Sequence, residues 1–165
     1  MKTTILAVFL LSLSLAAFGQ QSIPTDNTSR QDAVVRRGDH VMGFSHDATT
    51  HHFHLLNDGG EIIVTADDTN DKTSIEQIRT HLNHIASMFS NGNFKAPLLI
   101  HDTNPPGVAT MTRLKSAIRY TLSKISQGAK VRIETSSPET TDAVHAFLLF
   151  QIADHKTGDV PTIGG

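Results

Sequence analysis

The sequence predicts a single α+β domain in which two antiparallel β-hairpins form one sheet layer and two main helices pack against it. Two pairs of short segments alternate apolar with polar residues and are joined by turn residues, as in hairpins. Two longer segments repeat apolar residues at helical spacing, and each follows one of the hairpins along the chain. The length of 165 residues fits one domain rather than two.

The amino-terminal residues 1–19 are typical of a cleavable secretory signal. Lys2 precedes the apolar residues 5–15, and small side chains lie at Ala17 and Gly19, as a signal-peptidase cleavage site requires. An apolar stretch of this length is too short to span a bilayer. We therefore expect cleavage near Gly19, a periplasmic or secreted protein, and no membrane anchor after cleavage.

The remaining chain divides by composition. Residues 20–38 are polar and aperiodic, which predicts a flexible linker, and residues 39–159 carry the periodic segments of the folded domain. Residues 160–165, with Pro161 and a double glycine, predict a frayed tail. The chain has no cysteine, which excludes disulfides, thiolate metal ligands and a cysteine nucleophile. Lysine and arginine total 14 against 16 acidic residues, so the charge pattern predicts no nucleic-acid partner.

The first hairpin and the first main helix follow from local patterns. Residues 52–56 and 61–65 alternate or are β-branched, and the Asn-Asp-Gly-Gly turn between them predicts a hairpin. Residues 74–90 then repeat apolar side chains at intervals of three and four, which predicts an amphipathic helix. Thr73 and Glu76 fit a capping box at its start.

The second half repeats this order after two short elements. Residues 97–100 form an apolar run that predicts a strand or a buried extended segment, and residues 108–115 predict a short helix. Residues 118–122 and 130–134 alternate and predict the second hairpin. The last helix is expected to begin after Ser137, an N-cap followed by proline. Its inward stripe consists of Val144, Phe147, Leu148, Gln151 and Ile152.

Histidine is the residue whose distribution indicates a function. The chain has 10 histidines, and many of them fall in two short windows, one from His46 to His54 and one from His81 to His84. Neutral imidazole is a common ligand of copper, zinc, nickel and iron. At about 100° per residue, His81 and His84 lie on the shoulder of the apolar face of their helix. A site between this helix and the sheet would lie there.

Strand periodicity separates the histidines of the first window. If Phe53 faces the core, His51 also faces inward, whereas His52 and His54 point away. One strand therefore cannot aim all three imidazoles at one ion. A site would use His51 with His46 from the preceding loop, or His52 with His54. The predicted metal ligands are His46, His51, His52, His81 and His84.

The pattern favours an exported histidine-rich protein that binds copper or zinc, or alternatively haem, for sequestration or handover. Met42 and Met88 lie near the two windows, and imidazole with thioether but no thiolate suits copper in an oxidising compartment. The first alternative is a cofactor-free module that binds a small molecule or a protein partner. The second is a small hydrolase or lyase that uses His101 with the adjacent Asp102, or the histidine cluster. His155 is expected to interact with the dipole at the end of the last helix.

Several motifs resemble those of a group of small exported bacterial proteins of unassigned function. They are Met-Gly-Phe-Ser-His at 42–46, Thr-Thr-His-His-Phe at 49–53, the double glycine at 59–60, His-Leu-Asn-His-Ile at 81–85, Ile-His-Asp at 100–102, Pro-Pro-Gly-Val at 105–108 and the ending at 150–158. The resemblance covers about residues 40–159. Members of the group sometimes carry the name aspartate carbamoyltransferase, but this chain lacks the Ser-Thr-Arg-Thr loop with which that enzyme family binds carbamoyl phosphate. His54 departs from the group's pattern, which ranks it behind His51 and His52 as a ligand.

Overall fold

The fold is built on a four-stranded antiparallel sheet in the order β1-β2-β4-β3. The two hairpins meet through β2 and β4, which leaves β1 and β3 as the edges. The structure is a computed structural model that describes residues 26–164, so the expected signal sequence lies outside the described residues. The strands are β1 (Thr49–Leu56), β2 (Gly59–Ala66), β3 (Ile118–Ile125) and β4 (Gly128–Thr135).

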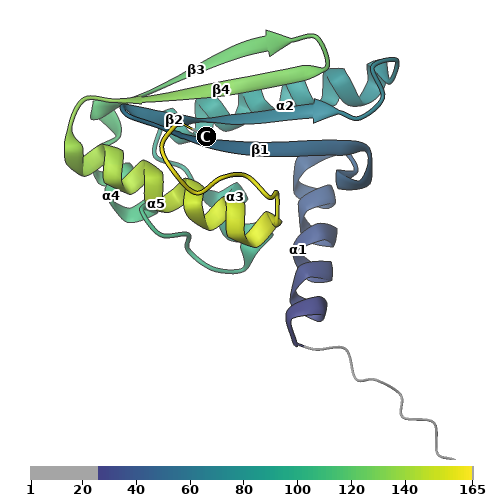
Figure 1. Ribbon diagram of the computed structural model, residues 1–165, viewed down its shortest axis with the longest axis horizontal. Coiled ribbons are helices and arrows are strands. Elements are labelled where there is room, and N and C mark those ends of the chain that lie inside the picture. Colours follow the sequence, from purple (N-terminus) through teal and green to yellow (C-terminus); the bar gives the residue numbers. More distant parts are fainter. Residues whose placement is uncertain (1–25, 165) are drawn as a thin grey trace, which may run out of the picture.

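Helices cover one face of this sheet (Figure 1), which confirms the α+β class. Two main helices, α2 and α5, pack directly against the strands, and α1 packs against α3 and α5. Within residues 26–164, none of the helices combines the length and the apolar character that a membrane span requires. The helices are α1 (Asp26–Met42), α2 (Lys72–Ser90), α3 (Lys95–His101), α4 (Val108–Arg113) and α5 (Pro138–His155), with 3-10 turns at His46–Ala48 and Lys115–Ala117.

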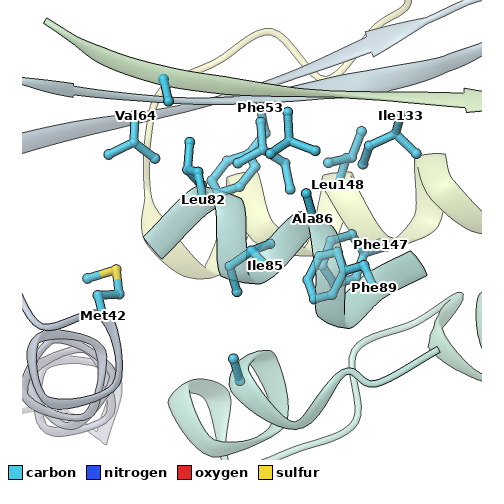
Figure 2. Close-up of a cluster of buried hydrophobic side chains, with 14 of the residues drawn as sticks. Met42, Phe53, Val64, Leu82, Ile85, Ala86, Phe89, Ile133, Phe147 and Leu148 are labelled. Carbon is cyan, nitrogen blue, oxygen red and sulfur yellow. The ribbon is translucent and has the colours of Figure 1, made fainter. Parts of the chain in front are cut away.

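The hydrophobic core lies between the covered sheet face and the two main helices (Figure 2). Val64 and Ile133 point from the strands toward Leu82 and Phe89 of α2 and Phe147 of α5, and all of them are almost fully buried. Phe89 and Phe147 meet edge to face, with ring centroids 5.8 Å apart. The predicted inward stripe of α5 is confirmed, because each of its residues is buried.

The helix α1 corrects the prediction of a flexible linker over residues 20–38, because the described part of that segment is helical. Val34 and Met42, two turns apart, are buried against neighbouring elements. Arg37 adds a hydrogen bond from Nε to the carbonyl oxygen of Ile100 at 2.8 Å. Because α1 has so few buried apolar residues, its sequence shows no recognisable helical period. The helix therefore depends on tertiary contacts for its stability.

Two further local predictions were wrong. Residues 97–100 belong to α3 rather than to a strand, and the proline is tolerated because it lies in the first turn of that helix. The N-cap of α2 is Asp71 rather than Thr73, and its side chain accepts a hydrogen bond from the Ser74 N–H at 3.0 Å. An ionised carboxylate is a stronger acceptor than a hydroxyl, which explains the earlier helix start.

The predicted frayed tail over residues 160–165 is ordered along the edge of β1, as far as the structure describes it. Ile163 forms a parallel bridge with Leu55, and Gly164 donates its N–H to the Leu55 carbonyl at 3.0 Å. The tail thereby pairs with backbone groups of an edge strand, which would otherwise be open to another chain.

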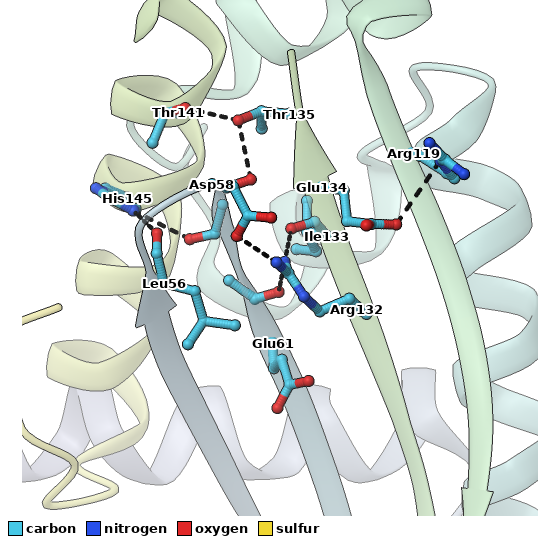
Figure 3. Close-up of polar contacts among 12 residues, drawn as sticks. Leu56, Asp58, Glu61, Arg119, Arg132, Ile133, Glu134, Thr135, Thr141 and His145 are labelled. Carbon is cyan, nitrogen blue, oxygen red and sulfur yellow. Dashed lines mark hydrogen bonds and ion pairs between the residues drawn. The ribbon is translucent and has the colours of Figure 1, made fainter. Parts of the chain in front are cut away.

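A polar network fixes the turn of the first hairpin (Figure 3). The Arg132 side chain reaches from β4 to the Asp58 carboxylate. The ring nitrogen Nε2 of His145 lies 2.9 Å from the carbonyl oxygen of Leu56 and 3.0 Å from that of Gly59. His145 therefore anchors a turn, and it lies apart from the histidines described below.

Gly107 is the tightest point between α4 and α5. Its φ is +82°, and a Cβ there would lie 2.0 Å from the carbonyl oxygen of Ala143. We expect Gly107→Ala to lower the free energy of unfolding by about 2–4 kcal/mol, because the backbone strain and the overlap act together. Urea unfolding measures this change. Gly158→Ala is the matched control, since its φ is +77° and nothing lies within 4 Å of the added Cβ. An equal loss in both variants would contradict the steric argument.

Candidate metal centre

Imidazoles from five separate elements converge beside the core, in the region that α1 covers. His51 comes from the inward face of β1, His81 from α2, and His155 from the last turn of α5. His101 ends α3, and His46 opens the 3-10 turn before β1. Each ring comes from a different element. The tertiary fold, and not a local sequence motif, therefore brings this cluster together.

Ring contacts link these side chains. His51 and His155 stack with centroids 5.7 Å apart and an interplanar angle of 9°, and His101 meets His155 edge-on at 5.0 Å. Phe44 stacks on His51 at 6.2 Å and contacts His81 edge-on at 5.6 Å. The two histidine windows of the sequence therefore meet in space.

Four of these histidines, His51, His81, His101 and His155, line a narrow pocket of about 60 Å³. His51, His81 and His155 border it together with Met42, and their ring nitrogens make no hydrogen bond to any other described residue. A water molecule occupies about 30 Å³ in the liquid, whereas pockets for organic ligands measure roughly 300–1,000 Å³. The pocket therefore has room for an ion and a water molecule.

Burial keeps three of these histidines neutral. It is the largest cause that lowers the pKa of His51 and His81 to about 4 and the pKa of His155 to about 3. Repulsion from neighbouring imidazoles, such as His81 acting on His51, lowers these pKa values further. The three rings are uncharged at pH 7 and present lone pairs, which is the form that binds metal ions.

His101 forms the back wall of the pocket and is 1 % exposed. Its Nδ1 lies 2.5 Å from the Asp154 carboxylate, which also pairs with Arg30 of α1 at 2.7 Å. Burial alone would raise the pKa of Asp154, but the hydrogen bonds from Arg30 and His101 lower it. The Nε2 of His101 lies 2.9 Å from Oε1 of Gln151. With both nitrogens engaged, His101 can position its neighbours but has no free nitrogen for an ion.

Gln151 brings an unpartnered polar atom to the same pocket. Its side chain is 4 % exposed, and its Nε2 has no hydrogen-bond partner among residues 26–164. An unpaired buried donor costs about 1–3 kcal/mol. A donor at this place can hold a water molecule or an anion that completes the coordination of an ion.

Two of the predicted ligands lie around the pocket rather than in it. His46 engages Asp39 at 3.2 Å and Asp47 at 3.0 Å through its two ring nitrogens. His84 is exposed and lines an open groove of about 670 Å³ between the end of α1 and the start of α2. His81 lines both this groove and the inner pocket, so it lies on the route between solvent and the other imidazoles.

His52 lies on the opposite face of β1, as the strand periodicity predicts. Its Nδ1 is 2.7 Å from Oδ1 of Asp159, and its ring centroid is 6.1 Å from that of His54. In the described part of the chain, His52, His54 and Asp159 are the one set of three histidine or acidic residues whose ligand atoms all lie within 4.8 Å of one another. The predicted ligands therefore divide into an inner and an outer group.

Sequence reasoning gave two of the inner histidines other roles and other partners. His155 was expected to interact with the helix dipole, but burial keeps its ring neutral. His101 was paired with the adjacent Asp102, which is exposed, whereas the carboxylate that contacts it is Asp154. The signal for His155 was present, because it follows Gln151 by four residues and so continues the inward stripe of α5.

Comparisons with known proteins give no relative from which a function could be transferred. No protein-family model, no curated protein and no solved structure matches this chain. The function has to be argued from the side chains of the chain itself.

Proposed function

We propose that this protein binds one copper or zinc ion in the inner pocket, for sequestration or handover, as an exported protein. The observation that carries the proposal is that His51, His81 and His155 line one small pocket with neutral rings and unpartnered nitrogens. In the described residues these ring nitrogens are not among the fully buried atoms that lack a hydrogen-bond partner, so water can reach them. An ion bound by all three rings would take the place of that water.

The spacing of the His51 and His155 rings is compatible with a shared ion. Two imidazoles on one tetrahedral ion, with metal–nitrogen bonds of about 2.0 Å, have ring centroids about 5 Å apart. The centroids of His51 and His155 are 5.7 Å apart, so a small shift and a rotation of each ring would bring their nitrogens to one ion. His81 is the proposed third donor, and its ring contacts Phe44, as the His51 ring does. Among the described residues the ligand atoms of His51, His81 and His155 do not all lie within 4.8 Å of one another, so His81 would also have to move to reach the ion.

The charge balance of the pocket favours copper(I). No carboxylate borders the pocket in the described part of the chain, so a divalent ion would keep its full charge in an apolar surrounding, at high cost. A monovalent ion needs less compensation, and Asp154 supplies a negative charge behind His101. Met42 adds a soft thioether at the rim, which copper(I) accepts more readily than zinc does.

The surrounding surface supports handover rather than catalysis. His84 and His81 lie along the groove that leads from solvent to the pocket, which gives an ion successive imidazoles on its way in. The pocket volume of about 60 Å³ is far below what haem would occupy, which argues for an ion.

The experiment is a copper(I) titration of the purified protein, prepared without a histidine tag, against a competing chromogenic chelator under anaerobic conditions. We expect one copper(I) per chain, and elemental analysis of the same sample reports any zinc. His40→Gln is the control, because His40 is exposed on α1 and does not line the pocket. A protein that takes up neither copper(I) nor zinc would overturn the proposal and favour the cofactor-free module.

A further inference from the structure

The outer face of β1 carries a second group of metal-binding side chains. His52 and His54 project from the strand, and Asp159 meets them from the segment after α5. The side chain of His52 is 42 % exposed and that of Asp159 is 9 % exposed. This group can therefore be reached from solvent, while its carboxylate is held in place.

The two oxygens of Asp159 have different partners. Oδ2 accepts the Phe53 N–H at 2.9 Å and the Thr157 hydroxyl at 2.7 Å. Oδ1 lies 2.7 Å from Nδ1 of His52. A carboxylate that is oriented through one oxygen and faces an imidazole through the other resembles a metal ligand with its supporting hydrogen bonds.

We propose that His52, His54 and Asp159 form a zinc site that fastens the C-terminal tail to β1. Two imidazoles, one carboxylate and a water molecule are a common zinc coordination. Ligand atoms on a tetrahedral zinc lie about 3.3 Å apart for bonds of about 2.0 Å. The His52 nitrogen and the Asp159 oxygen, now 2.7 Å apart, would have to separate only slightly to admit the ion.

The outer site would also steady the inner pocket, although it uses none of the inner ligands. His52 follows His51 on β1, and Asp159 lies four residues after His155. An ion that joins His52 to Asp159 therefore holds the segment that carries His155 against the strand that carries His51. The outer site does not require that the inner pocket binds copper.

The experiment adds zinc to the metal-free full chain and follows both binding, by calorimetry, and amide hydrogen exchange of residues 157–164. We expect zinc to slow exchange in this segment. His54→Gln should weaken this zinc binding by at least about 10-fold and remove the slowing. The variant leaves the His52–Asp159 contact in place, so the tail stays docked without metal. His40→Gln, which changes an exposed histidine on α1 outside both proposed sites, should behave like the wild type.

The two proposed sites can fail separately. His81→Gln changes an inner-pocket residue and none of the outer ligands, so it should keep the zinc-dependent slowing of residues 157–164. If His81→Gln removes that slowing, or if zinc leaves the exchange of the wild-type tail unchanged, the outer site is wrong. Neither result bears on copper(I) binding, which the titration of the inner pocket measures on its own.

Discussion

Glutamine at both His81 and His155 is expected to abolish copper(I) binding in the inner pocket. The double variant leaves His51 as the one unpartnered imidazole among those that line the pocket in the described residues. Loss of a residue that only supports a metal ligand costs about 10- to 100-fold in affinity. Removal of two direct ligands should therefore weaken binding by at least about 1,000-fold, measured by the same chelator competition.

The control for this variant removes the same number of histidines elsewhere. His40→Gln with His54→Gln changes one exposed residue on α1 and one on the outer face of β1. We expect this control to bind copper(I) like the wild type. Circular dichroism checks that both double variants are folded. If the His81 and His155 double variant is folded and still binds copper(I) with wild-type affinity, the ligands lie outside the inner pocket.

Acid should destabilise the metal-free protein between about pH 6.5 and pH 4. The pKa values of His51 and His81 are about 4 and that of His155 is about 3 in the folded state, against 6.5 for an unperturbed histidine. In this window the unfolded chain binds more protons than the folded one, so stability rises with pH and is lost as the pH falls. Each group changes the free energy of unfolding by up to about 1.4 kcal/mol per pH unit.

Urea unfolding at pH 7.5, 6.0 and 5.0, with a chelator present, measures this dependence. Replacing His155 by glutamine removes one of the three titrating groups, so its slope between pH 6 and pH 5 should be about one third smaller. Replacing the exposed His40 should leave the slope as it is in the wild type. Equal stability of the wild type at pH 7.5 and pH 5.0 would contradict the burial of neutral imidazoles.

The elements that could be predicted from the sequence are those with strong local signals. The Asn-Asp-Gly-Gly turn between β1 and β2 and the apolar periods of α2 and α5 are local, and those elements formed where expected. The α1 and α3 segments have no such signal, because their helical state depends on contacts with each other and with distant parts of the chain. The hydrogen bond from Arg37 to Ile100 is one of these contacts.

The same distinction applies to the candidate site. Strand alternation separated His51 from His52 and His54, because the side chains of a strand alternate between its two faces. No local pattern could show that His101 contacts Asp154 and His155, since α3 and α5 are distant in sequence. The predicted ligand set consequently mixed residues from two faces of the sheet.

The central claim is that the inner imidazoles share a metal ion, and anomalous diffraction from crystals grown with copper(I) tests it most directly. The account predicts an anomalous peak in the pocket, about 2.0 Å from ring nitrogens of His51, His81 and His155. A pocket that holds only water, with copper on exposed histidines such as His84 or His40, would contradict it.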